Sequence, residues 1–231
     1  MGGLIKRRDF LTAATAATLL SACDGGLIRR FGKAALTRSN DAFEELIFSR
    51  QRLAPELPRS EETPEQDFPA YFKSASIPIA PANWILRVGG LVQRPMVFTL
   101  DQLMRMPVTD MRVRHYCVDG WTAAASWRGV RLREIANLVG IDPRDRFVEF
   151  RSFDAGYWSG WDLDSALHPQ TLLAYGMNGH RLGAEHGAPL RLYSAVKLGY
   201  KNVKYLTDVN FLPTKVNGYW EDRGFDWFAG V

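Results

Sequence analysis

One cysteine, Cys117, stands among residue types that could carry redox or metal chemistry. It lies in the run Arg112-Val-Arg114-His115-Tyr-Cys-Val-Asp-Gly-Trp, at the expected end of a strand and the start of a Gly-Trp turn. Two arginines and a histidine so close in sequence predict an electropositive neighbourhood, which favours the thiolate that a nucleophile or a soft metal ligand needs. The other interpretation is a buried structural thiol, because free cysteine is among the most buried residue types.

A second group of candidates is cationic. The run His186-Gly-Ala-Pro-Leu-Arg191 is followed by Lys197, Lys201 and Lys204, and Gly199 between them allows close approach of the backbone. These cations would suit an anionic group such as a cofactor phosphate. The alternative is a solvated basic face on one strand.

Several common site types are not predicted. The four histidines and two cysteines have no zinc-type spacing. The sequence has no Gly-x-Gly-x-x-Gly run after an expected strand and no Gly-x-Ser-x-Gly elbow, which argues against nucleotide redox and α/β-hydrolase chemistry. It also has no Cys-x-x-Cys-His haem motif, so a redox enzyme of this sequence needs a separate electron partner.

Composition allows one globular domain with a real core. The 231 residues are 46% hydrophobic, 12% aromatic and 23% charged, which excludes disorder for most of the chain. Of the formal net charge of +4, Lys6, Arg7 and Arg8 against Asp9 supply half. The remainder is too small for a surface that tracks nucleic-acid phosphates, so nucleic acid is not an expected partner.

Residues 1–24 are typical of an export signal. A short basic segment precedes the apolar run Phe10–Leu20, which is too short to be a comfortable permanent membrane span. The pair Arg7-Arg8, followed by Asp-Phe-Leu, resembles the twin-arginine motif, which exports folded proteins and so suits a cofactor inserted in the cytoplasm. The alternative is a buried alanine-rich helix. The export interpretation predicts a periplasmic protein.

Cys23 ends this segment and offers a route to the membrane. Leu20-Ser-Ala-Cys23 resembles a lipobox, in which the cysteine is lipidated and becomes the mature N-terminus. The protein would then be a lipoprotein tethered through Cys23, and Cys117 would have no disulfide partner. Without lipidation, a Cys23–Cys117 disulfide is an alternative.

The rest of the chain divides into a polar linker or N-terminal arm, 25–70, and one domain, 71–231. Helical segments are expected at 99–106, 130–139 and 164–167. The expected strands are 84–88, 91–98, 111–117, 147–150, 172–177 with 181–182 as a hairpin around Asn178-Gly179, 190–193 and 203–211. Strands outnumber helices without regular βαβ alternation, so the fold class is α+β, with a mixed β-sheet or a partly closed barrel and short helices.

Both clusters, in this order and behind an export signal, resemble a known family. The chain is similar to the sulfite-oxidase-like molybdopterin oxidoreductases, and most to the exported bacterial branch that includes the catalytic subunit of protein-methionine-sulfoxide reductase. The resemblance runs from about Tyr71 to the C-terminus. It rests on six blocks: Cys117-Val-Asp-Gly-Trp121, Trp127-Arg-Gly-Val130, His168-Pro-x-Thr171, Asn178-Gly179, His186-Gly-Ala-Pro-Leu-Arg191 and Gly199-Tyr-Lys-Asn-Val-Lys204.

The resemblance implies a sulfite-oxidase-type fold and a molybdenum–molybdopterin cofactor. It implies that Cys117 is the metal ligand and the catalytic residue. Ser152 stands where relatives use threonine, and Ser74 where they have asparagine, a contact that the change puts in doubt. The implied cofactor-binding residues are Ser74, Cys117, Ser152, His186, Arg191, Lys197, Asn202, Val203 and Lys204.

The resemblance also bears on substrate and partner. Sulfite oxidases place an arginine directly before the tryptophan of the Trp-x-Gly block to grip their anionic substrate, whereas this chain has Ser126. The expected activity is two-electron oxygen-atom transfer on a small or side-chain oxo-substrate such as methionine sulfoxide. The expected electron partner is a membrane haem or quinol-linked protein. Sulfite oxidation and a non-catalytic exported binding domain are the alternatives.

The C-terminal run Gly218–Phe228 mixes aromatic and charged residues. It is expected to pack its rings on the domain while its charges stay solvated. The alternative is that it forms a lip of the substrate funnel or a docking face.

Overall fold

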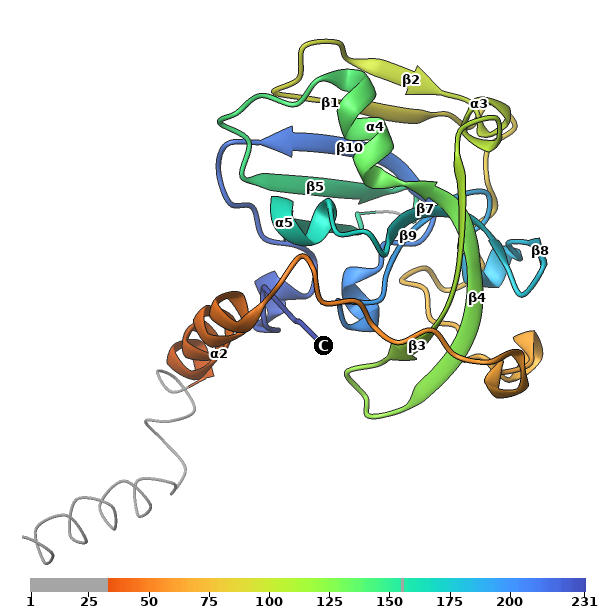
Figure 1. Cartoon of the computed structure of the whole chain (residues 1–231), viewed down its shortest axis with the longest axis horizontal. Coiled ribbons are helices and arrows are strands. Elements are labelled where there is room, and N and C mark those ends of the chain that lie inside the picture. The colour runs from red at the N-terminus through yellow and green to blue at the C-terminus, as the bar shows by residue number, and fades with distance from the viewer. Residues whose placement is uncertain (1–32, 155) are drawn as a thin grey trace, which may run out of the picture.

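In the computed structural model, the described part of the chain contains two β-sheets of five strands each (Figure 1). The structure describes residues 33–154 and 156–231. The predicted export signal, with Arg7, Arg8 and Cys23, lies outside these described residues. Among the described residues, no helix is both long and apolar enough to cross a bilayer.

The first sheet is mixed, as the sequence predicts. Its central pair is parallel, with Val88 opposite Val209, and the other pairs are antiparallel. Gly90 ends the first strand with a φ of 86°, where a Cβ would lie 2.1 Å from the carbonyl oxygen of Phe211. In spatial order the strands are β2 (Met96–Phe98), β1 (Leu86–Gly90), β10 (Leu206–Leu212), β5 (Phe147–Ser152) and β6 (Trp158–Asp162).

The second sheet is antiparallel and carries a long hairpin, formed by β3 (Val108–Tyr116) and β4 (Thr122–Arg131), that curves away from the first sheet (Figure 1). The Asn178-Gly179 hairpin is confirmed, with φ of 50° and 85° at the two turn residues. Residues 33–154 and 156–231 form no closed barrel, because their strands are divided between two sheets. The strands are β3 (Val108–Tyr116), β4 (Thr122–Arg131), β7 (Thr171–Met177), β8 (His180–Arg181) and β9 (Arg191–Ser194).

Apart from the 15-residue helix Lys33–Ile47, the described α-helices have eight residues or fewer, and two of these have clear sequence signals at one end. The predicted capping box is present, with the Thr99 side chain accepting from the Gln102 N–H while the Gln102 side chain accepts from the Thr99 N–H. Gly140 ends its helix in the left-handed region at φ 67°. The helices are α2 (Lys33–Ile47), α3 (Leu100–Met104), α4 (Leu132–Val139) and α5 (Leu163–Ala166).

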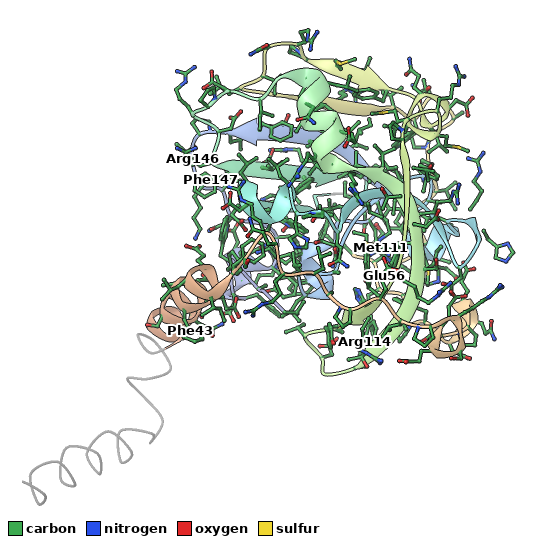
Figure 2. All side chains as sticks on the ribbon, in the orientation of Figure 1. Phe43, Glu56, Met111, Arg114, Arg146 and Phe147 are labelled. Carbon is green, nitrogen blue, oxygen red and sulfur yellow. The ribbon has the colours of Figure 1, made fainter. Side chains whose placement is uncertain are left out.

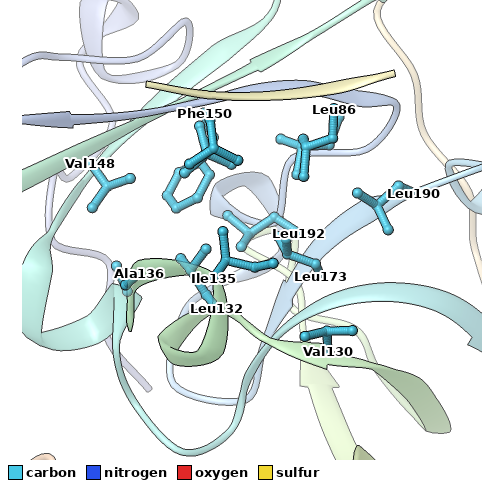
Figure 3. Close-up of a cluster of buried hydrophobic side chains, with 14 of the residues drawn as sticks. Leu86, Val130, Leu132, Ile135, Ala136, Val148, Phe150, Leu173, Leu190 and Leu192 are labelled. Carbon is cyan, nitrogen blue, oxygen red and sulfur yellow. The ribbon is translucent and has the colours of Figure 1, made fainter. Parts of the chain in front are cut away.

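The hydrophobic core has two parts. The larger lies between the first sheet and α4, where Leu132 and Ile135 face Phe150 and Leu86 (Figure 3). The smaller is centred on Trp127 and the other inward side chains of the second sheet. Because the smaller cluster is rich in rings and lies beside the polar groups described below, it forms a rigid support for them.

Residues 49–68 form an arm that crosses the second sheet. The Leu57 N–H donates to the Arg112 carbonyl at 2.9 Å, and the Thr63 N–H donates to the Ala124 carbonyl at 2.8 Å. At its inner end, Phe68 is 5% exposed and packs against the rings of the smaller core. The arm therefore brings Phe68 to the same place as the turn that follows β3.

Candidate cofactor site

A cavity of about 450 Å³ opens beside the turn between β3 and β4. It is bounded by the arm, this turn, the segment after β5, the stretch from 186 to 205 and the C-terminal run. Its lining includes Phe68, Tyr71, His115, Cys117, Asp119, Trp121, Ser152, Asp154, Tyr157, His186, Arg191, Gly199, Asn202, Lys204, Tyr205, Tyr219, Trp220 and Phe225. Three of the six sequence blocks therefore meet at this cavity, namely the cysteine block and the two cationic blocks. The other three blocks contribute no residue to its lining.

The turn that carries Cys117 is fixed by its own backbone. The Cys117 N–H donates to the Trp121 carbonyl at 3.0 Å, and the Gly120 N–H donates to the Cys117 carbonyl at 3.1 Å. Gly120 has a φ of 88°, which favours glycine at this position. The thiol is partly exposed and lies 3.6 Å from Oδ2 of Asp119. The turn therefore presents the sulfur at the cavity surface.

Arg112 and Arg114 do not supply the electropositive neighbourhood that the sequence predicted for Cys117. Arg112 and Arg114 lie on the opposite face of β3, because alternate residues of a strand point to opposite sides. There they pair with Glu62 at 3.0 Å and Glu61 at 2.7 Å on the arm. Burial, with the Asp119 carboxylate as a further cause, raises the pKa of the Cys117 thiol. A bound metal must therefore displace the thiol proton itself.

Arg191 is a buried cation without a carboxylate partner among the described residues. It is 5% exposed, and its guanidinium donates to the carbonyl oxygens of His186 at 2.9 Å and Asn202 at 3.4 Å. Burial lowers the pKa of Arg191 to about 10. A buried charge is costly unless an opposite charge meets it, so this site calls for an anionic ligand.

Lys204 and His186 extend the same cationic side of the cavity. The Lys204 ammonium donates to the Glu185 carbonyl at 2.7 Å, and burial together with Arg191 lowers the pKa of Lys204 to about 7. His186 is 2% exposed, and burial and then Arg191 lower its pKa to about 4. His186 is therefore neutral at pH 7, and it adds a polar edge without a further charge.

Several buried polar atoms at the cavity have no hydrogen-bond partner among the described residues. They are Nδ1 of His115, Nε1 of Trp121, Nε2 of His186 and Oη of Tyr205. Buried polar groups are nearly always paired, so these atoms are suited to a ligand. A Cβ on Gly199 would lie 2.7 Å from Nε2 of His115, so only glycine leaves this approach open. These polar atoms suit the polar edge of a pterin. The nearby thiol of Cys117 suits its metal, and the cations Arg191 and Lys204 suit its phosphate.

Ser152 and Asn202 reach the cavity, but their side chains are partly committed. Ser152 Oγ accepts from the Asp154 N–H at 2.9 Å. The Asn202 amide accepts from the Ser194 N–H at 2.6 Å and donates to the Lys197 carbonyl at 3.2 Å. Asn202 therefore shapes the 197–202 loop in addition to lining the cavity.

Three residues predicted to bind the cofactor do not line the cavity. Ser74 turns its hydroxyl to the carboxylate of Asp154. Lys197 is fully buried and donates to Asp162 at 3.1 Å and to the Phe228 carbonyl at 2.6 Å. Val203 has no exposed surface and belongs to the larger core. The side chains of Ser74 and Lys197 are therefore occupied by intramolecular contacts instead of facing the cavity. For Val203, whose side chain packs in the core, the predicted phosphate contact is one made by the backbone.

Ser126 also lies outside the cavity lining. Its N–H donates to the Asn178 side chain at 2.9 Å, at the β8 end of the second sheet. Position 126 is therefore not part of the cavity surface, although the sequence predicted that its residue type bears on the substrate. The charge that does stand beside the sulfur is the Asp119 carboxylate, which repels anions.

The structure adds residues that sequence reasoning did not single out. Asp154 is 4% exposed, lines the cavity and accepts from the Lys73 N–H at 2.6 Å. A lone aspartate after a strand is too common to signal such a role. From the C-terminal run, Tyr219, Trp220 and Phe225 line the cavity. These three rings lie at the cavity, as in the alternative in which the C-terminal run forms a lip of the substrate funnel. Trp227 and Phe228 are instead buried, as expected if the run packs its rings on the domain.

Comparisons with known proteins agree with this geometry. Residues 74–220 match the family model described as oxidoreductase molybdopterin binding domain. A putative protein-methionine-sulfoxide reductase subunit YedZ1 of Azospira oryzae is 38% identical over 85% of this chain and 75% of its own length. The protein-methionine-sulfoxide reductase catalytic subunit MsrP of Xanthomonas axonopodis is 32% identical over 60% of this chain. The matched region is about half (48%) of the length of that protein.

A solved structure shows the same fold. The sulfane dehydrogenase SoxCD from Paracoccus pantotrophus superposes with a TM-score of 0.63 at 22% identity, over 72% of this chain and 46% of that one. The family match covers the cysteine turn, the cationic stretch and most of the cavity lining. The chain therefore belongs to the molybdopterin-binding oxidoreductase family, as a molybdenum-dependent oxidoreductase whose cofactor is molybdenum–molybdopterin.

Proposed function

We propose that this chain reduces a sulfoxide, in an exported protein that receives electrons from a membrane partner. The reaction takes one oxygen atom from sulfur and consumes two electrons and two protons, giving a thioether and water. The observation that carries the proposal is the placement of the Cys117 thiol and the buried, unpaired Arg191 in one cavity. Relatives named protein-methionine-sulfoxide reductase support the substrate class.

The chain's own residues would hold the cofactor in defined ways. Cys117 Sγ is the protein ligand to the metal, and Arg191 with Lys204 receives the phosphate. His186 and His115, whose pKa values burial lowers to about 4 and about 3, stay neutral and serve the polar edge of the pterin. When bound, the molybdenum centre supplies two-electron oxygen-atom transfer. The protein's part is to orient that centre and to control access to it.

The cavity lining favours a neutral substrate over an anion. Tyr71, Trp121, Trp220 and Phe225 supply aromatic surface, which makes favourable contacts with the sulfur of a thioether. Asp119 places a carboxylate 3.6 Å from the ligating sulfur, where it repels an anion such as sulfite. The substrate we propose is therefore a sulfoxide on a small molecule or on a methionine side chain.

Export and tethering are proposed from the sequence. The Arg7-Arg8 pair and the lipobox-like end at Cys23 support a periplasmic lipoprotein exported by the twin-arginine route. The sequence has no Cys-x-x-Cys-His motif, which supports electron delivery by a separate membrane haem or quinol-linked protein. Cell fractionation tests this. The protein is expected in the periplasmic membrane fraction, the Arg7→Lys/Arg8→Lys variant in the cytoplasm, and Cys23→Ser outside the lipoprotein pool.

The enzymatic proposal is tested on protein matured with its export signal intact. Molybdenum is expected at one atom per chain, and a reduced viologen dye is expected to drive reduction of methionine sulfoxide. Cys117→Ser should lose both. Turnover of sulfite with ferricyanide, without sulfoxide reduction, would replace the proposed substrate. Metal-free protein that binds its partner equally well with Cys117→Ser would instead show a non-catalytic domain.

A further inference from the structure

Helix α2 exposes three large apolar side chains on one face. Phe43, Leu46 and Ile47 are 59%, 81% and 52% exposed, and Figure 2 labels Phe43 on this helix. Their i, i+3, i+4 spacing places them on a single stripe. Single exposed apolar residues are ordinary on protein surfaces, but three on one turn mark an interaction surface.

Another side of α2 is fastened to the C-terminal segment. The Asp41 carboxylate accepts from the Phe228 N–H at 2.8 Å, and Glu44 accepts from the Gly230 N–H at 3.0 Å. Asn40 donates to the Asp226 carboxylate at 2.9 Å. The polar residues of α2 thus bind the C-terminal segment of the domain. The apolar stripe is left exposed, without a partner among the described residues.

The segment that precedes α2 limits its distance from a membrane. Only residues 24–32 separate Cys23 from the first residue of α2, Lys33. Nine residues span at most about 32 Å when fully extended. After Asp24 this stretch has Arg29 and Arg30 and no acidic residue, a charge that suits the anionic surface of a bilayer. A lipid on Cys23 would therefore make α2 the first described helix within reach of the membrane.

We propose that the Phe43–Leu46–Ile47 stripe rests in the interfacial region of a lipid bilayer and sets the orientation of the cavity above it. This inference rests on the proposed tether at Cys23. Acyl chains hold a protein near a membrane but leave it free to rotate, whereas a short apolar stripe adds a second, oriented contact. The C-terminal segment transmits the orientation, because it is bound to α2 and also supplies Tyr219, Trp220 and Phe225 to the cavity.

The stripe is tested by site-directed spin labelling of the lipidated full-length protein in phosphatidylethanolamine–phosphatidylglycerol vesicles. Leu46→Cys carries the label in one variant. Glu45→Cys is the matched control, since residue 45 is exposed on the same helix but points away from the stripe. Wild-type protein taken through the same labelling supplies the background from Cys117. The label at 46 is expected to be several-fold more accessible to oxygen than to a water-soluble nickel chelate, and the label at 45 to show the reverse.

Three outcomes would overturn the inference. They are equal chelate access at 45 and 46, shielding of 46 that appears only when the redox partner is present, and an N-terminal peptide whose mass shows no lipid on Cys23. The second outcome would make the stripe a protein interface. Dye-driven sulfoxide reduction on the same vesicles reports the proposed function separately, and it is expected to be unchanged in Leu46→Cys because α2 does not line the cavity.

Discussion

The guanidinium of Arg191 lies over the indole ring of Trp127, with its Cζ 4.8 Å from the ring centroid. Trp127 in turn stacks on Tyr193, with the ring centroids 4.0 Å apart. The cation is thus held by an aromatic face and carbonyl oxygens, and its charge is left for a ligand. This arrangement explains why a buried arginine can persist without an internal carboxylate partner in the described chain.

Replacing Arg191 with methionine is expected to separate cofactor binding from folding. The molybdenum content should fall by an order of magnitude or more, because the charge-assisted contact to an anionic group is lost. The unfolding free energy of the cofactor-free protein should stay the same or rise, since an unpaired buried charge is removed. Metal analysis and urea unfolding measure the two effects. Arg191→Lys is the control and should retain an intermediate molybdenum content; full molybdenum in Arg191→Met would contradict the role.

Replacing Asp119 with asparagine is expected to lower the pKa of the Cys117 thiol in the cofactor-free protein. The carboxylate accepts the thiol hydrogen bond and repels a thiolate, and both effects raise the pKa. Alkylation by iodoacetamide near pH 8 should become several-fold faster, as mass spectrometry would show. Asp110→Asn, on the half-exposed pair with Arg128, is the matched control and should not change the rate. An unchanged alkylation rate in Asp119→Asn would show that this carboxylate does not raise the pKa of the Cys117 thiol.

Lys201→Met is expected to destabilise the protein by about 3–5 kcal/mol, the usual cost of leaving one partner of a buried ion pair alone. Lys201 and Glu221 are 0% and 3% exposed, and the Lys201 ammonium also donates to the carbonyls of Gly160 and Trp227. The lost contacts should also make the C-terminal run easier to cleave in limited proteolysis.

The comparison for this ion pair is an exposed one. Arg128→Met breaks a pair whose side chains are both 52% exposed, and it should cost less than about 1 kcal/mol in guanidinium unfolding. The double variant Lys201→Met/Glu221→Gln should recover part of the loss. Equal effects of Lys201→Met and Arg128→Met would contradict the structural role of Lys201.

The protein is expected to lose stability as the pH falls below about 6.5. Burial, and secondly Arg191, lower the pKa of His115 to about 3 in the folded state. Between the unfolded value of about 6.5 and pH 3, the unfolded chain binds a proton that the folded chain does not, at a cost of up to ~1.4 kcal/mol per pH unit. Denaturant midpoints from pH 7 to pH 4 measure it.

His115→Phe should flatten this pH dependence, because the ring is kept and the titrating group is removed. His180→Phe, at an exposed position in β8, is the control and should leave the dependence unchanged. A steep loss of stability that persists in His115→Phe would assign the effect to other groups, of which His186 is next, with a pKa that burial lowers to about 4.

Local sequence rules predicted several elements correctly. The Thr99 capping box, the helix end at Gly140 and the Asn178-Gly179 hairpin all formed where expected. Each depends on backbone geometry and hydrogen bonds within a few residues, which a sequence displays directly. Whether the strands form a mixed sheet or a partly closed barrel depends on pairing between strands far apart in the sequence, such as β1 with β10. Local sequence rules do not display that pairing.

The sequence by itself determined which residue types could hold a metal and an anion, through the cysteine turn and the cationic blocks that mark the family. Only the tertiary structure decided which of them meet. Strand alternation turned Arg112 and Arg114 away from Cys117, and internal partners withdrew Lys197 from the cavity. Long-range packing brought Tyr219 and Trp220 to it. A side chain's neighbours depend on contacts between residues far apart in the chain, and those contacts are fixed only when the whole domain folds.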